Sequence, residues 1–162
     1  MGTITMDYLM NHCFEKTGLE NEVYNRPYVS GMFSQQEIGR LPKTDEDKLD
    51  ELRIKMGDLI REKCGGYPGL YVKTNINPST MKKYVSPSAH RNIPREMLAK
   101  FVVGLGLSLE EANEMFYLLS YPLDVSAMRL DAVVVHCIEN GLDIYGFFDT
   151  CEQIHLEVAM SN

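Results

Sequence analysis

The sequence lacks any apolar run that approaches the roughly 18 residues a membrane-spanning helix needs, and its best run covers only residues 132–135. The first ten residues contain no basic segment and no small-residue cleavage site, so a secretory signal is not indicated. None of the four cysteines stands in a C-x-x-C pair, which excludes a zinc ribbon and a thioredoxin-like redox motif. From these absences we expect a soluble, cytoplasmic protein with reduced cysteines.

Patterns typical of catalysis are also missing. The four histidines lie far apart and match no H-E-x-x-H or nucleophile-elbow pattern. The pair Gly104 and Gly106 lacks the third glycine of a phosphate-binding loop, and we interpret both as close-packing and helix-ending residues. Cys137, Cys151 and His155 could together hold a transition metal, but thiols in apolar stripes are usually core residues. We therefore expect no enzyme, no metal and no other cofactor.

The charge of the chain is distributed unevenly. There are 16 Lys and Arg residues against 23 Asp and Glu, and the net charge of −7 argues against non-specific nucleic-acid binding. Residues 51–100 nevertheless carry 10 basic and 4 acidic side chains, whereas residues 101–162 carry 1 and 10. A basic centre between acidic flanks is what a localised phosphate-facing surface requires, although solvated helix faces would give the same pattern.

Helical patterns run through most of the chain, and strand patterns are scarce. Residues 45–64 carry apolar side chains at helical spacing and are followed by two glycines. Ser108 and Glu111 have the spacing of a capping box, in which each side chain binds the other residue's backbone N–H. The sequence thus predicts an all-α fold, a compact helical bundle with short turns. Later helices are expected over residues 94–106, 109–121, 126–140 and 144–158.

Two short elements inside the basic block have the size of a helix-turn-helix, namely PGLYVKT and PSTMKKY, joined by residues 75–77. The first helix of such a pair braces the second against the core, so Leu70 and Ile76 must be apolar. The second helix buries one side, here Met81 and Tyr84. Its other side presents polar groups to the DNA major groove, here Ser79, Lys82 and Lys83. Asn77 can cap this second helix, and Pro78 suits its first position.

These segments resemble a known family. INPSTMKKY is similar to the second helix of phage-repressor-like (Cro-like, XRE-type) helix-turn-helix proteins. LYVKTNINPSTMKKY followed by REMLAKFVVGLGLSLEEANEMFYLLSY looks like an uncharacterised bacterial or phage subgroup of that family. DAVVVHCIENGLDIYGFFDTCEQI resembles the two-helix C-terminal extension that many members of the subgroup carry. The resemblance covers about residues 47–156 and implies a helical domain that docks its second short helix in the major groove.

The resemblance also implies roles for single residues. Pro78, Ser79 and Lys82 fall at base-facing positions, and Lys83 falls towards phosphate. The chain departs from the family at Pro68 and Gly69, where polar residues are usual, and it has no Gln or Asn in the middle of the second helix to read adenine. The full set of expected DNA-binding residues is Lys73, Asn77, Pro78, Ser79, Lys82, Lys83, His90, Arg91 and Arg95, with Lys100 at the same basic rim.

The sequence further predicts three regions. Residues 1–45 form an N-terminal helix and arm, 46–122 the helix-turn-helix domain, and 123–162 a C-terminal helical extension packed on it. After Gly18 no helical period is sustained, so residues 19–43 are expected to form an extended arm or ordered loop. The short helix before this arm would be lined by Met6, Leu9, Met10, Cys13 and Phe14.

The function expected from these features is that of a transcriptional regulator, a repressor of bacterial or phage origin. It would bind double-stranded DNA sequence-specifically as a homodimer, on half-sites roughly 34 Å apart. The alternative is a protein-interaction adaptor or a phage-encoded inhibitor. The acidic net charge and the ten methionines, which adapt well at binding surfaces, favour this alternative. Either the arm or the acidic C-terminal helices could form the protein contact.

Overall fold

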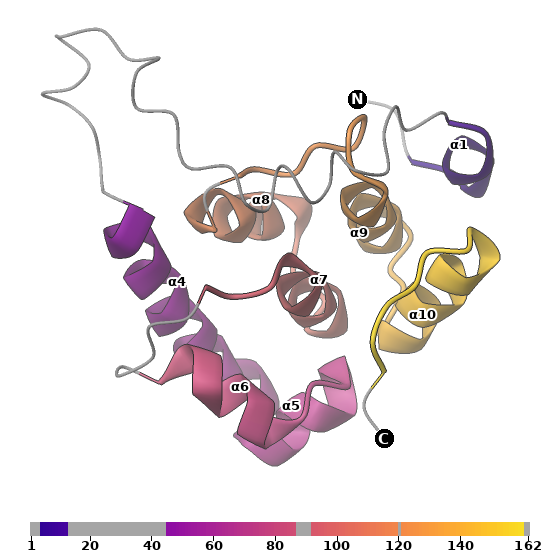
Figure 1. Ribbon diagram of the computed structural model, residues 1–162. Coiled ribbons are helices and arrows are strands. Elements are labelled where there is room, and N and C mark those ends of the chain that lie inside the picture. The colour runs from indigo at the N-terminus through magenta and orange to yellow at the C-terminus, as the bar shows by residue number, and fades with distance from the viewer. Residues whose placement is uncertain (1–3, 13–44, 87–91, 120, 161–162) are drawn as a thin grey trace, which may run out of the picture.

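The computed structural model describes residues 4–12, 45–86, 92–119 and 121–160, and its regular structure within them is entirely helical. The predicted all-α helical bundle is thereby confirmed. No helix in these ranges is long and apolar enough to cross a membrane. The elements are α1 (Met6–Asn11), α4 (Asp45–Leu59), the π-helical turn η2 (Ile60–Cys64), α5 (Tyr67–Thr74), α6 (Pro78–Val85), α7 (Arg95–Gly104), α8 (Leu109–Leu118), α9 (Arg129–Glu139) and α10 (Ile144–Gln153) (Figure 1).

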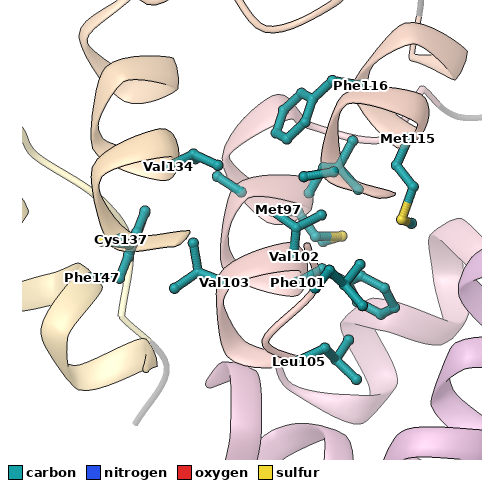
Figure 2. Close-up of a cluster of buried hydrophobic side chains, with 14 of the residues drawn as sticks. Met97, Phe101, Val102, Val103, Leu105, Met115, Phe116, Val134, Cys137 and Phe147 are labelled. Atoms are coloured by element: carbon teal, nitrogen blue, oxygen red, sulfur yellow. The ribbon is translucent and has the colours of Figure 1, made fainter. Parts of the chain in front are cut away.

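Helix α7 lies at the centre of the bundle (Figure 1), where it packs against α5, α8, α9 and α10. Phe101 and Val102 are completely buried, and Val103 is nearly so. Figure 2 shows side chains of α7 between Phe116 of α8 on one side and Phe147 of α10 on the other. Apart from Lys100, residues 97–103 of α7 are all apolar, and a helix with apolar residues around most of its circumference belongs inside a core, which explains the central place of this segment.

The capping signals act as the sequence predicts. The Ser108 side chain accepts a hydrogen bond from the backbone of Glu111, and the Glu111 carboxylate accepts one from the backbone of Ser108. Gly65 and Gly141 follow η2 and α9 with φ angles of 68° and 64°, a conformation that glycine adopts without strain. These local interactions set the lengths of the helices around α7.

Three predicted helix boundaries are wrong, and the first is the end of the helix predicted over 109–121, which lies at Leu118. The helix predicted to open at Ser126 begins at Arg129, because the Asp124 carboxylate accepts hydrogen bonds from the backbone of Ser126 and holds a turn there. The last helix ends at Gln153, so Val158 does not belong to it. Beyond it His155 takes a left-handed φ of 58°, and the chain continues without helical structure.

The N-terminal segment docks on α9. The backbone N–H of Ile4 donates to the Glu139 carboxylate at 2.7 Å, and the Ile4 carbonyl lies 2.6 Å from Nδ1 of the buried His136. Leu9 is buried, but Met10 is 58% exposed and therefore does not lie on the apolar face predicted for it. The predicted contributions of Cys13 and Phe14, and the predicted arm 19–43, lie outside the described residues.

Candidate nucleic-acid interface

Helices α5 and α6, the two short elements singled out in the sequence, are joined by a three-residue turn. Asn75 ends α5 in the left-handed conformation, with φ at 59°, and its backbone N–H donates to the Tyr71 carbonyl. The buried Thr74 hydroxyl donates to the Leu70 carbonyl and accepts from the backbone of Ile76, which ties the turn to the preceding helix. Leu70 and Ile76 are buried as predicted. The Thr74 hydrogen bonds and the two buried apolar side chains thus fix the conformation of the turn.

The start of α6 is capped by Asn77. Its side-chain oxygen accepts hydrogen bonds from the backbone N–H of Ser79 at 2.9 Å and from the Ser79 hydroxyl at 2.6 Å. Pro78 occupies the first helical position, where a missing backbone N–H costs nothing. Because the exposed Ser79 hydroxyl gives its proton to Asn77, its oxygen is left to act as a hydrogen-bond acceptor. Such an acceptor matches the amino groups of adenine and cytosine in the major groove.

Helix α6 has one buried and one exposed side. Met81 is completely buried, Val85 is nearly so, and Tyr84 is half-buried with its carbonyl accepting a hydrogen bond from Arg53 Nε. The polar side chains predicted to face outward are exposed, namely Ser79, Lys82 and Lys83. Packing on α4 and α5 therefore presents this polar side to solvent.

Exposed lysines stand on three consecutive elements, η2, α5 and α6, and we call them together the basic surface, which consists of Lys63, Lys73, Lys82 and Lys83. The Lys73 ammonium donates to the Lys63 carbonyl at 2.9 Å, which joins the end of α5 to η2. The Lys82 ammonium lies 5.0 Å from the centre of the Tyr67 ring, within cation–π range. Sequence reasoning missed Lys63 and Tyr67, and the only available signal was that both fall in the basic block.

Arg95 is not part of this surface, so the prediction that it joins a phosphate-binding rim is wrong. Its side chain is 2% exposed and donates to both carboxylate oxygens of Asp131, at 2.9 and 2.5 Å. The same guanidinium donates to the carbonyls of Tyr121 and Pro122. Burial raises the pKa of the Asp131 carboxyl, while the hydrogen bonds and charge of Arg95 act in the opposite direction. Arg95 instead anchors the loop that follows α8.

Lys100, expected at the same rim, is also buried. Its ammonium donates to the Ala159 carbonyl and lies 3.7 Å from the Glu96 carboxylate. Burial lowers the pKa of Lys100, and Glu96 opposes this shift. His90 and Arg91, the remaining expected DNA-binding residues, lie outside the described residues.

Cys137 and Cys151, which together with His155 could have held a metal, lie in the core. Burial raises the pKa of both thiols to about 12, as expected for cysteines among apolar side chains. His155 is exposed at the end of α10. In the ranges that the structure describes, no three His, Cys, Asp or Glu side chains are grouped to hold a metal ion.

The close packing of α5 on α7 depends on Gly104. A Cβ atom at this residue would lie 2.3 Å from the Lys73 carbonyl oxygen and 2.9 Å from the Thr74 Cα. Only glycine allows α7 and α5 to approach this closely, which confirms the close-packing role predicted for Gly104.

No protein-family model, curated protein or solved structure matches this chain.

Proposed function

We propose that this chain is a sequence-specific DNA-binding transcriptional regulator that acts as a repressor through α5 and α6. The observation that carries the proposal is the exposed side of α6, where Ser79, Lys82 and Lys83 stand opposite the buried Met81 and Val85. An α-helix with polar residues on one side fits the major groove of duplex DNA. The resemblance to phage-repressor-like (Cro-like, XRE-type) proteins of bacteria and phages supports the same role.

The proposed contacts divide into base-reading and phosphate-binding groups. Ser79 is the second residue of α6, in the first turn where recognition helices contact base edges, and Lys82 lies three residues further along the helix. The Lys82 ammonium is suited to the O6 and N7 acceptors of guanine, and the Ser79 oxygen to an amino group. Lys63, Lys73 and Lys83 would neutralise phosphates, which gives affinity without sequence preference.

Charge also orients the protein on DNA. The sequence from residue 101 onward carries ten acidic side chains and one basic one, and helices α8, α9 and α10 come from this part. Phosphate repels these helices and attracts the basic surface. Two copies related by a two-fold axis would place their α6 helices in successive major grooves roughly 34 Å apart. We therefore propose a homodimer on a palindromic site.

Selection from a random pool of DNA duplexes at physiological salt tests the proposal. The purified protein is expected to enrich one motif, and a palindromic motif would support the dimer. Ser79→Ala and Lys82→Ala are each expected to change base preference at one or two positions, because these side chains contact base edges. Lys55→Ala on α4, where Lys55 pairs with Glu114, is the control and should keep the parental motif. If both α6 variants keep it as well, α6 is not the recognition helix.

Lys83→Ala is expected to weaken binding to all DNA sequences about equally. Loss of one phosphate contact should reduce the slope of log K against log salt by about 1. The measurement is a salt titration by fluorescence anisotropy with a specific and a non-specific duplex, with Lys55→Ala as the control that keeps the parental slope. An unchanged slope in Lys83→Ala would remove this residue from the phosphate contacts.

A protein-interaction adaptor or phage-encoded inhibitor is the second candidate function. Val72 on α5 favours it, because this apolar side chain is 70% exposed beside Lys73 of the basic surface. A selection without enrichment, together with DNA binding no tighter than roughly micromolar, would support this candidate over the regulator.

A further inference from the structure

A groove runs between α10 and the segment that follows it, on a part of the bundle formed by the C-terminal residues. Its lining combines apolar and acidic side chains. Tyr145 and Met160 are 72% and 63% exposed, although they are large and apolar. The lining includes Tyr145, Phe148, Asp149, Glu152, Glu157 and Met160.

The outer wall of the groove, residues 155–160, is held in place by α7. The buried Lys100 ammonium donates to the Ala159 carbonyl, and the Ala159 backbone N–H donates to the Glu96 carboxylate at 3.0 Å. At the start of the wall, the backbone of Leu156 donates to the Cys151 carbonyl at 2.9 Å. The segment 155–160 is therefore hydrogen-bonded to the bundle near both of its ends, so the groove is part of the folded structure.

The charge of this part of the chain has one sign. The sequence contains no Lys or Arg after Arg129, while Asp149, Glu152 and Glu157 all line the groove and are exposed. Carboxylates on an apolar groove repel nucleic acid and anionic lipid alike. They attract Lys and Arg side chains, whose alkyl stems can also cover apolar surface.

We propose that this groove binds a basic amphipathic segment of a partner protein. Apolar side chains of the segment would lie against Tyr145, Phe148 and Met160, and its Lys or Arg side chains would pair with the carboxylates. Exposed large apolar residues with a charged rim are typical of a protein-binding surface. Helix α10 packs on α7 and α9, whereas α6 packs on α4 and α5 (Figure 1), so the groove and the proposed DNA-binding helix belong to different parts of the bundle.

The test uses a fluorescein-labelled Leu–Lys peptide of roughly four helical turns, with leucines at helical spacing. Saturable binding to the full chain is expected by anisotropy, and a peptide with Glu in place of each Lys should not bind. Tyr145→Ser should weaken binding about ten-fold, because central aromatic anchors carry most of the energy of such contacts. Glu152→Lys should weaken it as well.

Glu62→Lys in η2 is the matched control, because it makes the same change in net charge at an exposed site on another element. It should leave peptide affinity within about two-fold of the parent, as expected for a screened, distant charge. Circular dichroism establishes that each variant is folded. Equal losses in Glu62→Lys and Glu152→Lys would overturn the proposal, and so would unchanged binding in Tyr145→Ser. Concentration-dependent dimerisation that is lost in Tyr145→Ser, without peptide binding, would assign the groove to a second copy of the chain instead.

Discussion

Replacing Gly104 by alanine should lower the free energy of unfolding by about 1–3 kcal/mol, the range typical of an overpacked interior. The new Cβ would lie 2.3 Å from the Lys73 carbonyl oxygen and 2.9 Å from the Thr74 Cα, and both are backbone atoms. A side chain could rotate away from such a contact, but here α5 itself must move off α7. Because α5 carries α6 through a three-residue turn, DNA binding should fall even at temperatures where the variant remains folded.

Gly57→Ala is the matched control for this substitution. Gly57 lies inside α4, and a Cβ there would meet nothing closer than the Val85 side chain at 3.8 Å. Alanine in a helix interior should raise the free energy of unfolding by roughly 0.5–1 kcal/mol relative to glycine. Urea unfolding of the parent and both variants measures the two effects. Equal stabilities of the Gly104→Ala variant and the parent would mean that α5 does not depend on this close approach.

The parts of the fold that could be predicted from the sequence depend on neighbours within one helical turn. Asn77 and Pro78 mark the start of α6 because the cap binds a backbone group two residues away. Leu70 and Ile76 could be assigned to the core because a short helix pair has few ways to bury its apolar residues. These signals are local in the sequence, so they can be interpreted without knowing which other elements pack against the two helices.

Arg95 and Lys100 could not be placed correctly because their partners are distant in the sequence. Arg95 binds Asp131, 36 residues later, and Lys100 binds the carbonyl of Ala159, 59 residues later. A weak signal did exist for Arg95. A cation at the start of a helix opposes the helix dipole, so this position calls for a compensating carboxylate. Lys100 lies within the apolar run MLAKFVV, which is unusual for a solvated residue.

The groove beside α10 was beyond prediction for a different reason. After α10 ends at Gln153, His155 turns the chain with a left-handed φ, and no glycine or proline stands in the segment from Cys151 to Met160 to signal the turn. Histidine adopts this conformation more readily than most residues, but too rarely for a confident boundary. Because the helix was predicted to continue to Val158, the predicted fold did not contain the non-helical segment 155–160 that forms the outer wall of the groove.

Asp131→Ala should cost about 3–5 kcal/mol of stability, the largest effect expected here of removing one charged side chain. The substitution leaves the Arg95 guanidinium buried without its carboxylate, and it also removes the acceptor of the Asp124 backbone N–H. Arg95 holds the loop after α8 through the carbonyls of Tyr121 and Pro122, so loss of its charge partner should loosen this loop as well.

The exposed pair Lys55–Glu114 provides the comparison, since its N···O distance of 2.9 Å is similar but its side chains are 37% and 57% exposed. Glu114→Ala should cost less than about 1 kcal/mol, because water solvates the remaining lysine. The double variant Arg95→Met/Asp131→Leu should regain most of the stability lost in Asp131→Ala, because it removes both charges and keeps apolar packing against Phe116, over whose ring Arg95 lies at 4.7 Å. Urea unfolding of all four proteins separates the cost of an unpaired buried charge from the value of the pair. If Asp131→Ala lowers the free energy of unfolding no more than Glu114→Ala does, the buried Arg95–Asp131 pair does not stabilise the packing of α7 on α9.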